Sequence, residues 1–587
     1  MKNKRDYGGS NRFGIAVLCL VFSTLSWGGR DTSDVPPIGS ATIIPADRKI
    51  DWSRAGVWEN GLKGIPNRTV VFCNVKVTIP GSVLVAKGDG VRDDTAALQA
   101  AINTCPAGQV VYIPQGTYRI SGTLRVGKGI VVRGADPSNT KIIQYANADI
   151  FDLYGTSEYG VMTTVTSGYS KGSDTIVVAD PANFSVGALV LIDQLNDPSL
   201  VTQIGIEGSC TWCGYERGDR AMGETLLIKE KNGNTLKFNR PLCYNYEAAY
   251  KPHLTRMSTT TLTHAGVEDL NIESASTGTD GGGFSMAYCA YCWLKNVESY
   301  NIPYKHVEIK WAACGNEVRD SYFHHTKNFD GDHGYGVNIN SHSTDNLIEN
   351  NIFYYLHAPV AIGSGGGAGN VIGYNYIERS EHYQPKWFIS HIATHGAHTY
   401  MNLFEGNVLG KVGLDPTWGS GSHQVFFRNR ITGVNTGTVV TQDLVAVEIC
   451  SLNYFITIVG NILGYPGYRG QVEQNPYKGF ENNPVLWLIG HPGAIKKGPP
   501  SDAKVAETLL RTGNWESPNN AVQWATSVRT IPDSLYLASK PSWFGSLAWP
   551  PFTPERPGFD PNNFNKIPAQ VRFGNTPKVG LSGDPTY

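Results

Sequence analysis

The chain has 587 residues, a formal net charge of -1 at pH 7 and only 17% charged residues. This balance, without a basic run interleaved with aromatic residues, argues against a nucleic-acid partner. Glycine accounts for 66 of the 587 residues, about 11% against a typical ~7%. Together with frequent β-branched and aromatic residues, this composition predicts β-structure with many tight turns.

The N-terminus has the features of a secretory signal. Lys2, Lys4 and Arg5 precede an apolar stretch over residues 13–25, which is too short to cross a bilayer comfortably. We therefore expect a signal peptide over residues 1–28 and a secreted protein, extracellular or periplasmic, without membrane contact after signal removal. An uncleaved membrane anchor is the alternative.

Ten cysteines, nine of them after the signal, fit an oxidising compartment in which disulfides persist. Because nine is odd, at least one thiol stays unpaired. Two C-x-x-C pairs could instead form a zinc site. The local pairings to be tested are Cys73/Cys105, Cys210/Cys213 and Cys289/Cys292.

Residues 29–80 are irregular and predict an N-terminal extension that covers the open end of a solenoid, because an exposed sheet edge needs a cap. The next segment, residues 81–158, begins with a helix that Asp93 or Asp94 can cap. Strand patterns then run from Val110 onward. The apolar face of the helix would carry Ala97, Leu98, Ala101 and Ile102.

Residues 85–145 resemble the first coil of the pectate-lyase-like superfamily, of the rhamnogalacturonase/epimerase type. The segment KGDGVRDDTAALQAAI (87–102) matches its pattern G-D-G-x-x-D-D-T-x-A-[IL]-Q-x-A-[IL], and VVYIPQGTY (110–118) matches V-x-[IFL]-P-x-G-x-Y. The resemblance implies a right-handed parallel β-helix and allows a calcium ion; no cofactor is otherwise indicated. It does not define the reaction, because the superfamily hosts lyases, hydrolases, epimerase-like proteins and phage tailspikes.

Residues 159–255 interrupt the solenoid spacing and predict a small antiparallel β subdomain inserted between early coils. The pair Asn232-Gly233 between two strand patterns is a hairpin signal. Gripping the substrate and capping the solenoid are both open as roles for this subdomain.

An Asn followed by a β-branched or aromatic residue recurs in steps of 22 to 32 residues. A period of this size indicates a solenoid, and Asn suits turns and stacked ladders. We expect the main β-helix over residues 256–470, followed by a Pro/Trp-rich C-terminal wrap over residues 471–587. The fold class is thus an all-β, single-stranded right-handed parallel β-helix, expected to be a monomer. The repeat comprises Asn271, Asn296, Asn351, Asn375, Asn407, Asn429 and Asn461, with Ser321 in the gap.

The strands ahead of these asparagines expose polar residues by alternation. Val307-Glu308-Ile309-Lys310 points Glu308 and Lys310 outward, and the next coil exposes Asn338 and Asn340. Small residues follow at 361–367. A sugar chain could lie along this column.

Eleven of the 14 histidines fall between residues 306 and 423, and His is the natural general acid or base near neutral pH. Any one of them could equally be structural. His391, His395 and His398 could also bind a metal, but their spacing is loose and we predict no metal site. The catalytic candidates are Lys310, His333, His391, His395, His398, Asp415 and His423, and the substrate-binding candidates are Glu308, Asn338, Asn340, Asp330, Asp332, Trp418 and Arg428.

Motif checks exclude the two best-known branches of the superfamily. The polygalacturonase motifs N-T-D, D-D, G-H-G and R-I-K do not occur in order, and the W-x-D-H and R-x-P-x-x-R segments of pectate lyases are absent. We predict an enzyme that cleaves an acidic, uronate-containing polysaccharide, with β-elimination favoured by the central His, Lys and Arg. Hydrolysis by Asp330/Asp332 or Glu308/Asp415 is the close alternative, and a non-catalytic polysaccharide binder is the third.

Overall fold

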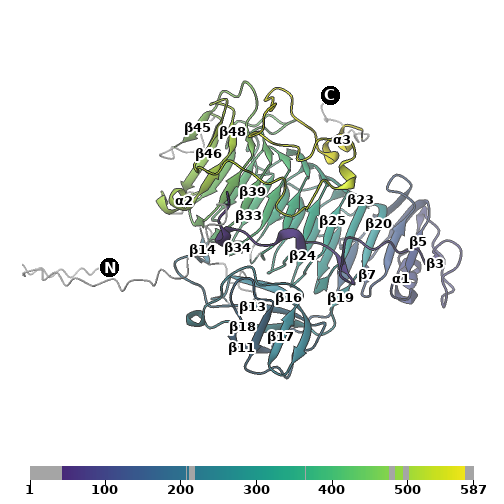
Figure 1. Ribbon diagram of the computed structural model, residues 1–587. Coiled ribbons are helices and arrows are strands. Elements are labelled where there is room, and N and C mark those ends of the chain that lie inside the picture. The colour runs from purple at the N-terminus through teal and green to yellow at the C-terminus, as the bar shows by residue number, and fades with distance from the viewer. Residues whose placement is uncertain are drawn as a thin grey trace, which may run out of the picture. The chain divides into compact units, whose positions relative to one another are not determined.

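The computed structural model describes residues 42–205, 208–209, 218–363, 365, 367–474, 483–493 and 501–575. Its main feature is a parallel β-helix in which each turn of the chain, called a coil, adds strands to three parallel stacks (Figure 1). An antiparallel barrel is inserted after the first coils. The predicted fold class is therefore confirmed. The signal peptide expected over residues 1–28 lies outside the described residues.

The first stack, called the long sheet, has eleven strands and carries the face discussed below. In each strand, alternate residues enter the core: Val307 and Ile309 are fully buried, while Glu308 and Lys310 point outward as expected. In spatial order the strands are β7 (Leu124–Val126), β10 (Phe151–Tyr154), β21 (Phe284–Ala287), β24 (Lys305–Lys310), β27 (Tyr335–Ile339), β30 (Ala358–Ile362), β33 (Ile392–His395), β37 (Val412–Asp415), β41 (Val445–Cys450), β46 (Val485–His491) and β45 (Gln471–Gln474).

The second and third stacks share the long strands β20 (Gly266–Ser274) and β23 (Trp293–Ile302). The second stack also contains β3 (Val71–Asn74), β5 (Val110–Ile113), β8 (Val131–Gly134), β25 (Glu317–Arg319), β28 (Leu347–Glu349), β31 (Val371–Gly373), β35 (Leu403–Glu405), β39 (Val425–Phe427), β43 (Thr457–Val459) and β47 (Leu510–Thr512). The third contains β4 (Asp89–Asp93), β6 (Gly116–Ile120), β9 (Thr140–Gln144), β26 (Tyr322–Thr326), β29 (Ile352–Leu356), β32 (Tyr376–Ser380), β36 (Val408–Leu409), β40 (Arg430–Ile431), β44 (Ile462–Leu463) and β48 (Asn514–Glu516), with β49 (Ala521–Gln523) antiparallel to β48. The parallel stacks thus continue past residue 470.

Five of the seven recurring asparagines, from Asn351 to Asn461, form a buried ladder, as their proposed structural role requires. The backbone N–H and the Nδ2 of Asn375 both donate to Oδ1 of Asn407, at 2.9 and 3.1 Å. This pattern satisfies polar groups that burial would otherwise leave without a partner. The ladder runs through Asn351, Asn375, Asn407, Asn429, Asn461 and Asn514. A second ladder, which the sequence repeat did not reveal, runs through Asn316, Asn346, Asn370 and Asn402.

The inserted subdomain is a closed six-stranded antiparallel barrel with its own apolar core. Asn232 pairs with Thr235 across the predicted hairpin. The barrel is tied to the β-helix by Arg240, which forms ion pairs with Glu224 of the barrel at 2.7 Å and Asp345 of the solenoid at 2.6 Å. Its strands are β11 (Met162–Ser167), β12 (Thr175–Val178), β17 (Thr235–Phe238), β16 (Gly223–Asn232), β13 (Leu189–Asp193) and β18 (His253–Ser258).

The first coils are closed by the predicted helix, α1 (Thr95–Thr104), whose four expected apolar residues are buried against the core. Asp94 occupies its N-cap position, but its carboxylate accepts from the backbone N–H groups of Lys87 and Gly88 instead. The last part of the N-terminal extension, β3, forms the terminal strand of the second stack, but an earlier part lies elsewhere. Trp52 donates to the carbonyl of Met401 at 2.8 Å, so the extension runs along later coils.

The C-terminal segment adds α2 (Ala503–Thr508) and α3 (Pro568–Asn575) and packs on the second and third stacks. In the part of the chain that the structure describes, no helix has the length and apolar content needed to cross a membrane. Cys73, Cys105, Cys289 and Cys292 are buried free thiols, so the disulfides suggested for them are not formed. Cys210 and Cys213 lie outside the described residues.

Candidate functional site on the long sheet

The outer face of the long sheet carries two columns of polar side chains, defined by strand register. Asp152, Ser285, Glu308 and Asn338 lie at equivalent positions on successive strands, and Ala361 continues that column. Small residues in later coils leave the floor of this face shallow. The face therefore combines charge, amides and space, as an extended polar ligand requires.

A second column contains a hydrogen-bonded pair of titratable residues. His395 ends β33 and Asp415 ends β37, and the two residues are paired in register. Nδ1 of His395 lies 2.8 Å from Oδ2 and 3.0 Å from Oδ1 of Asp415. Their side chains are 33% and 30% exposed, so a solute can reach them.

The partners of His395 define its protonation. A carboxylate can only accept, so Nδ1 of His395 carries the hydrogen that Asp415 receives. Trp418 donates its indole N–H to Nε2 of His395 at 3.1 Å, which requires a lone pair on that nitrogen. The neutral imidazole thus keeps a basic lone pair on Nε2, which accepts the Trp418 N–H in this structure and could accept a substrate proton if the indole moved aside.

The charge of Asp415 is maintained despite burial. Burial alone would raise its pKa, but the charge and hydrogen bond of His395, with those of Thr417, hold the pKa below its ordinary value. The backbone N–H of Thr417 donates to Oδ1 of Asp415 at 3.0 Å. An ionised Asp415 stabilises the imidazolium that forms when His395 takes a proton.

Two lysines flank the Glu308 carboxylate. Lys305 contacts Glu308 at 2.7 Å, and Lys310 forms a second ion pair with it. Burial would raise the pKa of Glu308, but these two cations lower it to about 2. The cluster carries a net positive charge, and the ammonium of Lys310 also lies 4.6 Å from the centre of the Trp311 ring.

Asn338 and Asn340 lie between this cluster and His395. Asn340 donates to Oδ1 of Asn338 at 2.8 Å and to Glu308 at 3.3 Å. A Cβ atom added at Gly363 would lie 3.3 Å from Nδ2 of Asn338, so the Asn338 amide lies beside the residue that follows β30. The Asn340 amide instead points toward Glu308.

The sequence did not reveal the acidic part of the face. Burial and the nearby charge of Asp149 raise the pKa of Asp152 to about 6, although the charges of Arg125 and Lys310 oppose this shift. Asp149 accepts from the backbone N–H of Gly282 at 2.7 Å. The sequence could have indicated this residue, because the alternation of apolar and polar residues in Phe151-Asp152-Leu153-Tyr154 places Asp152 outward.

Aromatic rings border the same end of the face. Tyr154, Tyr288 and Trp311 have ring centroids 5.7 to 6.1 Å apart. Trp311 is 37% exposed. Such rings offer apolar surface beside the charges of Lys310 and Glu308.

Three predicted catalytic histidines are structural instead. His398 bonds to the hydroxyls of Ser420 and Ser422 at 2.9 and 2.8 Å, and burial lowers its pKa to about 3. His423 stacks on Phe455, and burial likewise lowers its pKa to about 3.

His391 accepts the backbone N–H of Gly410 on Nδ1 at 2.8 Å. Burial lowers its pKa to about 4. The three histidines His391, His395 and His398 therefore form no common site.

The remaining sequence candidates are also displaced from His395. His333, Asp330 and Asp332 share a loop just before β27, at the start of the strand, whereas His395 lies at the end of β33. Arg428 is buried beneath the C-terminal segment, where it contacts Glu555 at 2.6 Å and three backbone carbonyls. It is not available to a substrate.

Calcium does not fit this face. Calcium prefers several oxygen ligands, but Glu308 is already bound by two lysines and Asp152 has a raised pKa. Among the described residues, one group of His, Cys and acidic side chains has ligand atoms within 4.8 Å of one another: Glu448, Cys450 and His491. This mixed, buried group is unlike a calcium site.

Comparison with known proteins supports the fold. Residues 84–203 match the family model "Rhamnogalacturonase A/epimerase, pectate lyase-like". A mannuronan C5-epimerase, AlgE2 of Azotobacter vinelandii, is 36% identical over 100 residues, which are 14% of this chain and 10% of that protein. Alginate lyase 7 of the same organism is 38% identical over 95 residues, 12% of this chain and 11% of that protein.

A longer match joins the chain to an exo-poly-alpha-D-galacturonosidase of Dickeya chrysanthemi. It is 24% identical over 427 residues, covering 66% of this chain and 62% of that protein. The chain thus spans less than two thirds of each of these three relatives. Residues 84–203 thus match the pectate-lyase-like family model, as the sequence resemblance implied, and the three parallel stacks show that the chain folds as a parallel β-helix.

Proposed function

We propose that the protein cleaves a uronate-containing acidic polysaccharide by β-elimination, with His395 as the base. The observation that carries this proposal is the His395–Asp415 pair, which offers a basic Nε2 on an open polar face. The matches to an alginate lyase and a mannuronan epimerase support it, because both names describe chemistry on uronate polymers.

The reaction needs one proton transfer and one bond cleavage. Nε2 of His395 takes the proton from C5 of the uronate, after the substrate displaces the indole N–H of Trp418. The electron pair of that C–H bond forms the C4=C5 double bond, and the bond from C4 to the glycosidic oxygen breaks. The imidazolium, stabilised by Asp415, then supplies the proton that the leaving oxygen needs.

Lys310 serves binding rather than proton removal in this scheme. β24 and β33 are three strand spacings apart, about 14 Å, so Lys310 and His395 address different sugar units. Lys310 would neutralise the carboxylate of a neighbouring uronate. Asn338, whose amide lies beside Gly363 just after β30, the strand next to β33, would hydrogen-bond the carboxyl group of the reacting unit, with Asn340 bonded behind it.

Hydrolysis is the second candidate, and Asp152 favours it. Its pKa of about 6 suits a general acid. Asp152 and Glu308 occupy the same column two strands apart, about 10 Å, near the ~6.5–9.5 Å range of inverting glycosidases. The ion pairs of Glu308 weigh against it as a base, so elimination ranks first. Secretion and a monomeric state remain proposals drawn from the sequence.

The test is incubation with pectins, alginate, glucuronan and neutral glucans, reading ultraviolet absorbance of unsaturated uronates beside reducing ends. Elimination predicts that both rise, and that His395→Ala and Asp415→Asn abolish the rise while His333→Ala, a half-buried histidine outside the site, retains it. If reducing ends appear without ultraviolet absorbance, and Asp152→Asn abolishes them, the reaction is hydrolysis and not elimination. If no polymer yields either signal, the non-catalytic polysaccharide-binding role would remain.

A further inference from the structure

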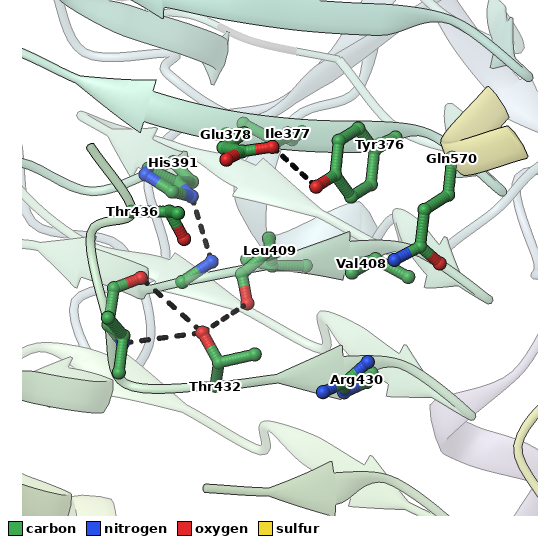
Figure 2. Close-up of a pocket in the computed structure, with 12 residues that line it drawn as sticks. Tyr376, Ile377, Glu378, His391, Val408, Leu409, Arg430, Thr432, Thr436 and Gln570 are labelled. Carbon is green, nitrogen blue, oxygen red and sulfur yellow. Dashed lines mark hydrogen bonds between the residues drawn. The ribbon is translucent and has the colours of Figure 1, made fainter. Parts of the chain in front are cut away.

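A pocket of about 140 Å³ opens on the outer side of the third stack. Its wall consists of residues from β32, β36 and β40, His391 just before β33, the loop after β40, and Gln570 of α3 (Figure 2). Tyr376, Val408 and Arg430 are paired in register across these strands. None of these residues takes part in the proposed cleavage.

Arg430 is the unusual residue of this pocket. Among the described residues, no carboxylate lies within 4.0 Å of its guanidinium, and its buried Nε has no hydrogen-bond partner. The guanidinium instead lies 4.1 Å from the centre of the Phe564 ring. Burial lowers its pKa, as expected for a cation without an ionic partner.

Other groups in the pocket are acceptors and hydroxyls. Oε1 of Gln570 is buried and also lacks a partner in the described structure. Glu378 accepts the hydroxyl of Tyr376 at 2.5 Å and is therefore partly satisfied. A cation and an amide oxygen, each with unused bonding capacity, thus line one small cavity.

We propose that this pocket binds the carboxylate of a single sugar acid. The carboxylate would pair with Arg430, and sugar hydroxyls would donate to Gln570 and Glu378. One water takes about 30 Å³ in the liquid, so the cavity has room for one small ring or chain end, not for a threaded polymer. The proposal rests on the proposed function only for the source of the sugar acid.

Two sources share this chemistry: the end of the polymer and a free sugar acid. Because the pocket belongs to the third stack and His395 to the long sheet, binding in the pocket does not require cleavage. A chain-end source predicts that a trimer of galacturonate binds at least as well as the monomer. A free acid predicts that the monomer binds better.

The test is calorimetric titration of the full chain carrying His395→Ala with galacturonate, trigalacturonate, galactose and acetate. Galacturonate should bind and galactose should not, and adding Arg430→Gln should weaken binding at least tenfold. Arg529→Gln is the matched control, because Arg529 is exposed and lies over Trp524 without lining the pocket. Gln570→Ala, on the surface helix, should weaken binding by a smaller factor.

Thermal melting without ligand checks that each variant is folded. Absence of uronate binding in the parent, or unchanged binding in Arg430→Gln, would overturn the proposal. So would binding that is lost with Lys310→Met and kept with Arg430→Gln, which would assign the ligand to the long sheet. A protein that binds galacturonate through Arg430 but yields no unsaturated product would refute the proposed function alone.

Discussion

The outer faces of the long sheet and of the second and third stacks have the same alternating strands but opposite surroundings. On the long sheet, His395 and Asp415 are about one third exposed. On the other two stacks, outward residues such as Val371 and Leu403 are buried with Phe544 and Phe552 of the C-terminal segment. The comparison teaches that alternation identifies an outward residue, whereas the segment that covers it decides whether the residue can meet a ligand.

The largest expected effect concerns the open face of the long sheet. His395→Ala removes the proposed base and should reduce turnover by ~10²–10⁴-fold, the range for a lost general base. Its melting temperature should stay near that of the parent, because a third of the side chain is exposed. Initial rates and thermal melting measure both. A variant with full activity would remove His395 from the mechanism.

The covered face is tested by Arg428→Ala. This change removes the guanidinium that contacts Glu555 and donates to three backbone carbonyls, although Arg556 still pairs with Glu555 at 3.3 Å. It should lower the free energy of unfolding by about 3–5 kcal/mol. Rates per folded molecule should not change. Denaturant titration measures the loss, and a reduced rate in the folded variant would contradict the structural assignment of Arg428.

The ladder between the faces is tested by Asn407→Ala. The substitution removes the acceptor for the N–H and Nδ2 of Asn375, and unsatisfied buried groups cost about 1–3 kcal/mol. Denaturant unfolding should show a loss in that range. Asn296→Ala is the comparison, because Asn296 donates to Asp269 outside the ladder and should cost less.

The smallest effect concerns pH. The pKa of Asp152 is about 6 in the folded protein against an ordinary 3.8, so the folded state holds its proton more tightly. The contribution of Asp152 to stability is therefore fully present below about pH 4 and is lost as pH rises through about 6, because the buried carboxylate ionises there. Asp152→Asn should raise the melting temperature at pH 7 and leave it unchanged at pH 4. An equal change at both values would contradict this account.

Much of the fold was accessible from sequence because its signals are local or periodic. The segment from 87 to 118 predicted the first coil, and the asparagine repeat predicted the solenoid. The second ladder escaped because its asparagines lie five residues before those of the first and are followed by Leu347, Val371 and Leu403, so only Asn370 meets the β-branched pattern. The path of the extension past Met401 depends on contacts distant in sequence, which no local pattern records.

The site was harder to predict because a histidine's role depends on its neighbours. His395 and His398 are three residues apart, yet one faces Asp415 on an open strand and the other bonds to two serines in the interior. Arg428 and Arg430 are two residues apart, yet Arg428 is buried against Glu555 of the C-terminal segment and Arg430 lines a pocket. Residue type singled out Lys310, Glu308 and Asp415 as candidates, but only the packing of the coils and of the C-terminal segment shows which candidate side chains are accessible and which are buried.

The pairing of His395 with Asp415 has a consequence for how such a protein can change. The two residues belong to different coils, so neither coil contains the dyad by itself. Inserting one whole coil between them would preserve every stack and yet part them by one strand spacing, about 4.8 Å. Adding a coil between β24 and β33 would instead keep the dyad and lengthen its distance from Lys310 by the same step. The number of coils therefore sets the distance between the Lys310–Glu308 cluster and the His395–Asp415 pair.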